Sequence, residues 1–100
     1  MRSIWKFKLE ISDLAIIEMP AGAEILCVQT QPIRPQSSRE TEAPFIWAIC
    51  DPAAKLEKRK FRVRGTGHPI DNLSEEIGRY VGSFQMRGGS FVLHVFGVDS

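Results

Sequence analysis

The chain has 100 residues, which is room for one domain with one hydrophobic core. Hydrophobic residues make up 43% of it and charged residues 25%, a balance typical of a folded globular domain and unlike that of a disordered chain. No apolar run approaches the ~20 residues that span a bilayer. We therefore expect a single domain over residues 1–100 and no membrane segment.

The first element is expected at residues 4–11, where apolar and charged side chains alternate. The apolar set is Trp5, Phe7, Leu9 and Ile11, and the charged set is Lys6, Lys8 and Glu10. A period of two indicates a strand with one buried and one solvated face. The charges here, and the lack of a small-residue cleavage site, argue against a signal peptide and favour a cytoplasmic protein.

Further strands are expected at residues 16–20, 24–31 and 44–51. The last of these is apolar on both faces, as in a strand that is covered on both sides. Residues 30–44 carry three prolines, two serines and alternating charges, which predicts a long mobile loop. This loop has no aromatic residue to anchor a partner, so we interpret it as a tolerated insertion, with a functional loop as the alternative.

The two cysteines, Cys27 and Cys50, each lie among apolar neighbours. They are too few for a disulfide scaffold, so we expect both to be buried, reduced thiols. A disulfide between adjacent strands is the alternative.

Two short helical turns are expected, at residues 51–60 and 72–80. Their capping and first-turn residues would be Asp51 and Pro52 in the first, and Ser74, Glu75 and Glu76 in the second. Strands at residues 60–64, 80–86 and 90–98 complete the pattern, and the Gly88-Gly89 pair predicts a hairpin between the last two. The predicted fold is mainly β: six to seven antiparallel strands in a compact sandwich or small barrel, with one or two helical turns.

Charge is segregated along the chain although the net charge is only +1. Residues 55–64 hold six of the thirteen basic residues and one acid, whereas residues 9–33 hold four acids and no base. Period two places Phe61 and Val63 inward and turns the basic side chains outward, as a stripe that suits phosphates or an acidic protein. The candidate binding residues are Lys58, Lys60, Arg62 and Arg64, followed by Gly65, Thr66, Gly67 and His68. The alternative is a solvated strand whose charges protect a sheet edge, because no outward aromatic residue interleaves with the stripe.

The stretch GTGHPI, residues 65–70, lacks the lysine and hydroxyl of a phosphate-binding P-loop and the third glycine of a dinucleotide site. Gly65 and Gly67 can adopt unusual backbone angles and Pro69 fixes its own, so we interpret the stretch as a turn that Asp71 closes. The alternative is a ligand site or an enzyme in which His68 acts as a base beside Thr66 or Asp71.

The other histidine, His94, lies mid-strand, and we expect it to be packed with one hydrogen bond. Histidines and cysteines fall at no metal-ligand spacing, and the carboxylates are scattered. We therefore predict no metal, no cofactor and no enzymatic activity.

The order of the stretches IWKFKLEI, IEMPAGAEILCVQ, WAICDP, FRVRGTGHPI and YVGSFQMRGGSFVLHVF resembles a family of small uncharacterised proteins from tailed-phage and prophage genomes. The resemblance covers nearly the whole chain, although family members have a much shorter connection where residues 30–44 stand. It carries no known activity or catalytic residues. It implies a phage or prophage accessory protein in the bacterial cytoplasm that binds a host or phage macromolecule without catalysis, counter-defence inhibition included. The alternative function is nucleotide or nucleic-acid binding through residues 55–64.

Assembly depends on the edge strands, because unpaired backbone groups there invite association. If the strand at residues 4–11 lies at an edge, Ile4 and Trp5 leave an apolar end exposed. A twofold dimer through this strand is one expectation, and a monomer with Trp5 in its own core is the other.

Overall fold

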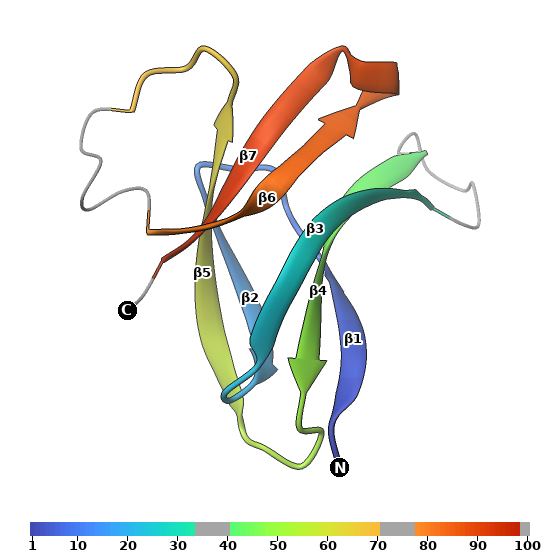
Figure 1. Cartoon of the computed structure of the whole chain (residues 1–100), viewed down its shortest axis with the longest axis vertical. Helices are drawn as coiled ribbons and strands as arrows, with labels where there is room; N and C mark the ends of the chain where they lie inside the picture. Colours follow the sequence, from blue (N-terminus) through green and yellow to red (C-terminus); the bar gives the residue numbers. More distant parts are fainter. Residues whose placement is uncertain (34–40, 71–77, 99–100) are drawn as a thin grey trace.

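The computed structural model describes residues 1–33, 41–70 and 78–98, which form seven strands and one 3-10 turn (Figure 1). The strands are β1 (Ser3–Lys8), β2 (Leu14–Pro20), β3 (Glu24–Pro32), β4 (Glu42–Cys50), β5 (Leu56–Gly65), β6 (Arg79–Met86) and β7 (Phe91–Val98), and the turn is η1 (Arg87–Gly89). All strand pairs are antiparallel and build a three-stranded sheet, β1-β4-β3, and a four-stranded sheet, β2-β5-β7-β6. The predicted all-β fold is confirmed as two packed sheets that do not close into a barrel. Within the described ranges, no helix has the length and apolar character to cross a membrane.

The hydrophobic core lies between the two sheets and takes alternate residues from most strands. Its buried members are Leu9, Ala15, Ile17, Met19, Ala23, Val28, Ile46, Ala48, Cys50, Phe61, Val63, Phe84 and Val95. Because side chains alternate across a strand, burying Phe61 and Val63 turns their neighbours in β5 to the outer face of the four-stranded sheet. The period predicted for this strand is therefore confirmed.

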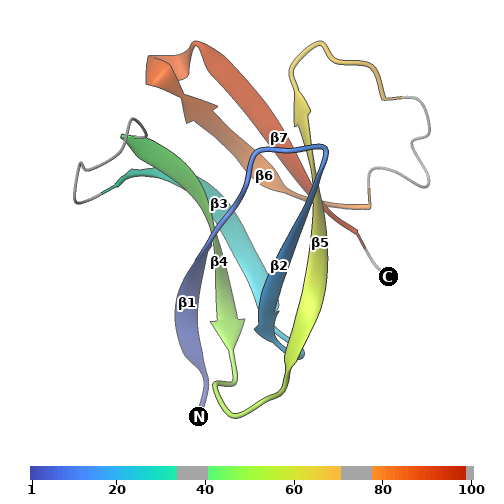
Figure 2. The ribbon, with the colours of Figure 1, turned by 180° about the vertical axis from the view of Figure 1, so that it is seen from behind.

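The two sheets approach most closely where β3 lies along β6 (Figure 1). Thr30 Oγ1 in β3 donates a hydrogen bond to the backbone oxygen of Gln85 in β6, at 2.8 Å. A Cβ atom on Gly82 would lie 3.2 Å from Val28 Cγ1, so the glycine permits this close approach. On the opposite side, β1 and β2 are the outermost strands of their sheets and are joined by the connection seen in Figure 2.

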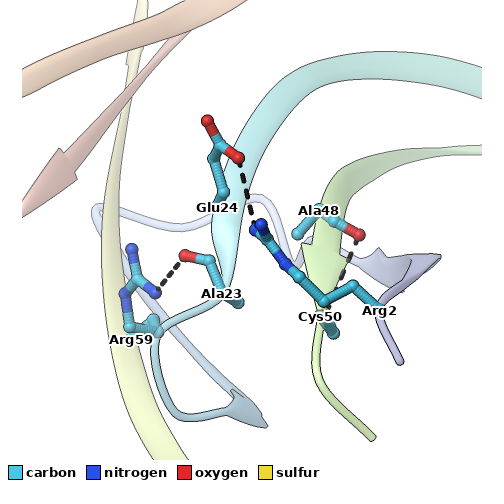
Figure 3. A network of polar contacts seen from close by, with 6 residues as sticks. All are labelled: Arg2, Ala23, Glu24, Ala48, Cys50 and Arg59. Carbon is cyan, nitrogen blue, oxygen red and sulfur yellow. Dashed lines mark hydrogen bonds and ion pairs between the residues drawn. The ribbon is translucent and has the colours of Figure 1, made fainter.

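Polar contacts fasten one end of the sandwich (Figure 3). Arg2 forms an ion pair of 3.4 Å with Glu24, which ties the start of β1 to the start of β3. Arg59 in β5 donates from Nη1 to the backbone oxygen of Ala23 at 2.9 Å, which ties the two sheets together. The side chain of Arg59 is thus used inside the fold.

Both cysteines are free thiols, but their surroundings differ. Cys50 is fully buried, its Sγ lies 3.8 Å from the backbone oxygen of Ala48, and burial raises the pKa of its thiol. Cys27 is only half-buried and lies opposite Trp47, on the outer face of the three-stranded sheet. The prediction of a buried thiol is confirmed for Cys50 and is wrong for Cys27.

The helical turn predicted at residues 51–60 is wrong. Asp51 accepts hydrogen bonds from Ala53 N at its side chain and from Ala54 N at its backbone oxygen, both at 3.0 Å, so it closes one turn. The chain then extends as β5 from Leu56 onward, because β2 and β7 offer it a ladder of backbone partners on both sides. Pairing across the sheet overrides the local helix signal.

The connection predicted at residues 30–44 is shorter than expected. β3 continues to Pro32 and β4 begins at Glu42, and the two pair as far as Pro32↔Glu42. A hydrogen bond of 3.0 Å from Ile33 N to Thr41 O extends the hairpin one step further. Residues 34–40 lie outside the described part of the chain, as do residues 71–77, which include most of the second predicted helical turn.

The three-stranded sheet is more exposed at its apolar positions than the sequence pattern indicates. β1 ends at Lys8, and Trp5, on the inner face opposite Ala48, is still 39% exposed because this strand has a neighbour on one side only. In β4, Phe45, Trp47 and Ile49 are half-buried, so the prediction of a strand covered on both faces is wrong.

The predicted hairpin between β6 and β7 is confirmed. Met86 pairs with Phe91, and the turn between them has left-handed backbone angles at Arg87, Gly88 and Gly89. The turn is therefore longer than the two-residue connection that a Gly-Gly pair suggests.

Candidate nucleic-acid interface

A row of basic side chains follows the outer face of β5. Its members alternate with the buried residues of the strand and are Lys58, Lys60, Arg62 and Arg64. β5 lies inside the four-stranded sheet, between β2 and β7. The interpretation of these charges as protection of a sheet edge is wrong for Lys60 and Arg62, because both lie where β5 pairs with β2 on one side and with β7 on the other. Lys58 pairs with β2 only, and Arg64 pairs with β7 only.

Two aromatic rings lie beside the basic row. Arg62 pairs with Phe96 in β7, and Phe96 pairs in turn with Tyr80 in β6. The rings of Tyr80 and Phe96 are 5.5 Å apart between centroids and tilted by 59°, and Tyr80 is 58% exposed. No outward aromatic residue interleaves with the stripe within β5, as the sequence indicates, but strand register brings these two rings beside it from β6 and β7.

A chain of hydrogen-bonded side chains supports this aromatic pair. Tyr80 Oη lies 2.7 Å from Ser83 Oγ, Ser83 Oγ lies 2.8 Å from His94 Nδ1, and His94 Nε2 lies 2.7 Å from Thr66 Oγ1. Thr66 Oγ1 donates to the backbone oxygen of Val92 at 3.2 Å, so it accepts the proton of His94 Nε2. A neutral imidazole then accepts at Nδ1 from Ser83, which accepts from Tyr80. His94 makes two side-chain hydrogen bonds, so the prediction of a single one is wrong.

The basic residues differ in how much the fold already uses them. Arg64 donates from Nη1 to the backbone oxygens of Asp13 and Val63, at 3.2 and 3.0 Å, and is largely enclosed. Arg62 Nε is shielded from solvent and has no hydrogen-bond partner among the described residues. Lys58 lies opposite Glu18 in β2, an acid on the same face. Arg62 Nε is thus a buried donor at the centre of the row that has no hydrogen-bond partner in the described structure.

The turn that follows the basic row brings together part of the predicted site. His68 N donates to Gly65 O at 3.1 Å, and Gly67 has a φ of 87°, a left-handed angle that suits glycine. A Cβ atom on Gly65 would lie 2.7 Å from His68 Cε1, so the imidazole packs directly on this glycine. Thr66 joins the hydroxyl chain, whereas His68 lies at an exposed hollow of about 560 Å³ with Thr66 and Phe91 on its wall. Asp71, the other partner considered for His68, lies outside the described residues.

Only some of the residues in β6 and β7 that complete this surface can be recognised in the sequence. Alternation around the buried Val95 places His94 and Phe96 on the outer face of β7, and this much is visible in the sequence. Their neighbours Ser83 and Tyr80 depend on the register of β6, which has an irregularity between Tyr80 and Gly82. No local pattern predicts such a bulge.

The arrangement has the chemistry of a binding surface. Cations along one strand can neutralise phosphates, and aromatic faces beside them can stack on bases. In the described ranges, histidine, cysteine, aspartate and glutamate side chains form no group of three that could hold a metal ion.

Comparisons with known proteins identify the family of this chain but indicate no activity. No curated protein and no solved structure gives a significant match. One family model matches residues 1–100, and its description is a domain of unknown function, DUF7352. The chain therefore belongs, over its whole given length, to the DUF7352 family.

Proposed function

We propose that the protein is a non-enzymatic binding module for single-stranded nucleic acid, and that the outer face of the four-stranded sheet is its binding surface. The observation that supports this function is the register Arg62↔Phe96↔Tyr80, which places a row of cations next to an aromatic pair made of a half-buried Phe96 and an exposed Tyr80. A single strand needs both features, since its phosphates bind cations and its unpaired bases stack on rings.

The position of the cations inside the sheet supports the same function. Lys60 and Arg62 lie where β5 is paired on both sides, so they cannot serve edge protection, and the row keeps several like charges next to one another at some cost. An anionic ligand removes that cost. The face holds four basic residues of β5 against two acids, Glu18 in β2 and Asp13, whose Oδ1 lies 3.9 Å from Arg64 Nη1. Its local charge is therefore positive although the chain is nearly neutral.

The test is binding of a fluorescent oligothymidylate of roughly 20 nucleotides, longer than the site of one small domain, measured by anisotropy over a range of salt concentrations. Substituting glutamine for Lys58, Lys60 and Arg62 should weaken binding at least about tenfold and reduce the salt slope by about 2, because each phosphate contact on a single strand contributes about 0.7. Arg64 is left intact because the fold uses it.

The matched control removes three basic residues from the other sheet. Substituting glutamine for Arg2, Lys6 and Lys8 takes away three charges as well, so in both variants the net charge goes from +1 to −2. This control should bind almost as well as the wild type. Equal losses of affinity in both variants would mean that net charge alone governs binding. An unchanged affinity in the β5 variant would mean that this face does not bind nucleic acid.

A second candidate is a protein partner, in keeping with the resemblance to tailed-phage and prophage accessory proteins. The observation in its favour is a hollow of about 290 Å³ at the β6–β7 hairpin, lined by Ile11, Met86, Arg87, Phe91 and Leu93. Aromatic, methionine and arginine side chains are enriched at protein interfaces, and Arg87 lies over the Phe91 ring at 5.5 Å. The proposed partner is a host or phage protein in the bacterial cytoplasm, with counter-defence inhibition as one outcome of such binding.

A pull-down from nuclease-treated bacterial lysate separates the two candidates. A stoichiometric protein that survives nuclease and is lost with Phe91→Ala supports the second candidate. The first candidate, nucleic-acid binding, is supported by molecules that are recovered only from lysate not treated with nuclease and that the β5 glutamine variant does not recover.

A further inference from the structure

The sandwich has two outermost strands that no other part of the described chain pairs on their outer side. β1 ends the three-stranded sheet and β2 ends the four-stranded sheet. The other ends of the sheets, β3 and β6, lie against each other (Figure 1). β1 and β2 therefore each present backbone donors and acceptors to a further strand, the feature through which sheets associate.

The two edges carry opposite charges. The charged residues of β1 and its flank are Arg2, Lys6 and Lys8, and those of β2 and its flank are Asp13 and Glu18. Pairing β1 with another β1 would bring cations opposite cations, which destabilises a strand pair. Pairing β1 with β2 of a second molecule would bring cations opposite acids.

Both edges also expose large apolar side chains. In β1 these are Ile4, 60% exposed, and Trp5. In β2 they are Leu14 and Ile16, 39% and 54% exposed. A new strand beside each edge would cover part of this apolar surface, which is the main source of free energy in association.

We propose that two copies of this chain form a twofold dimer in which β1 of each molecule pairs with β2 of the other. A twofold axis makes the two contacts equivalent, so a single dimer uses both open edges and leaves none for further growth. β1 does lie at an edge, which is the condition that the sequence sets for a dimer through this strand. The sequence suggests pairing of β1 with its own copy, beside a monomer as the other expectation, and the charges favour pairing with the oppositely charged edge instead.

The test is a charge exchange followed by light scattering of the full chain without nucleic acid. The wild type should have twice the 11.3 kDa mass of one chain at high protein concentration, and less at high salt. One variant makes β1 acidic, with Lys6→Glu and Lys8→Glu, and another makes β2 basic, with Ile16→Lys and Glu18→Lys. Each variant alone should be monomeric, whereas an equimolar mixture should form a heterodimer, because both of its contacts again join opposite charges.

A matched control makes the same kind of change on a strand that the dimer does not use. Leu26→Lys with Gln29→Lys in β3, both at exposed positions, should leave the dimer intact. If the acidic β1 variant fails to fold by circular dichroism, the basic β2 variant and this control still decide the outcome. A wild type that stays at 11.3 kDa overturns the dimer, and a basic β2 variant that remains dimeric overturns the pairing of β1 with β2.

Discussion

The outer faces of the two sheets hold the same kinds of residues in different arrangements. On the three-stranded sheet, Lys6 Nζ lies 4.7 Å from the centroid of Phe45 and 5.7 Å from that of Trp47, and it donates to Gln31 Oε1 at 2.8 Å. On the four-stranded sheet, Tyr80 and Phe96 contact each other, and the cations lie in a separate row beside them.

This difference shows that composition alone does not make a binding surface. A cation placed over a ring stabilises the fold by about 0.5–1 kcal/mol at an exposed site, and it covers the ring while doing so. A cation placed beside a ring leaves the ring face and the charge for a ligand. We therefore expect matched substitutions to have different effects on the two faces. On the four-stranded sheet they should mainly lower the affinity for nucleic acid, and on the three-stranded sheet they should mainly lower the stability of the fold.

The largest expected effect concerns the aromatic pair. Replacing Tyr80 and Phe96 by alanine should weaken oligonucleotide binding by about 1–3 kcal/mol for each base that stacks on them, or roughly fivefold to 150-fold per base. The salt slope should stay unchanged, because no phosphate contact is lost. Tyr80→Phe is the control and should keep most of the affinity. An alanine variant with wild-type affinity would show that the rings do not stack on bases.

The hydroxyl chain should matter less, and mainly for stability. His94→Ala removes two hydrogen bonds, of which each contributes about 0.5–1.5 kcal/mol, and it leaves Ser83 and Thr66 without their shared partner. Urea denaturation should show a loss of about 1–3 kcal/mol, and affinity should fall only severalfold as Tyr80 loses its support. A large loss of affinity at unchanged stability would instead mean that His94 contacts the ligand.

The smallest expected effect is a difference in stability between a substitution on one face and a matched substitution on the other. Lys6→Met should lower the free energy of unfolding by about 0.5–1 kcal/mol, since it removes the charge above the rings. Lys60→Met should change it by less than about 0.5 kcal/mol, as is usual for surface positions, while it weakens nucleic-acid binding. Urea denaturation and anisotropy on both variants give the comparison directly. Equal stability losses would contradict the difference between the faces.

The sequence predicts the fold well where the information is local. Alternation in β5 assigns Phe61 and Val63 to the core and the basic residues to the outer face, and the glycines after Met86 indicate the β6–β7 hairpin. The expected helical turn at residues 51–60 is wrong because strand pairing with β2 outcompetes a favourable capping pattern.

The candidate site is predicted only in part, for a physical reason. The basic row lies within ten residues of sequence, whereas Tyr80 and Phe96 reach Arg62 through two strand pairings and a bulge. Register is set by packing of the whole sheet, so the aromatic half of the surface has no local signature. His68 illustrates the converse, since it belongs to a distinctive local motif and yet lies in the turn beside the surface, whereas only Thr66 of that motif joins the hydroxyl chain.

The most direct test of the nucleic-acid surface is NMR titration of the isotope-labelled protein with oligothymidylate. Amide signals of β5, β6 and β7 around Lys60, Arg62, Tyr80 and Phe96 should shift, while those of β1 and β4 around Lys6 and Trp47 should stay in place. Shifts centred on the three-stranded sheet, or no shifts at millimolar oligonucleotide, would contradict the account.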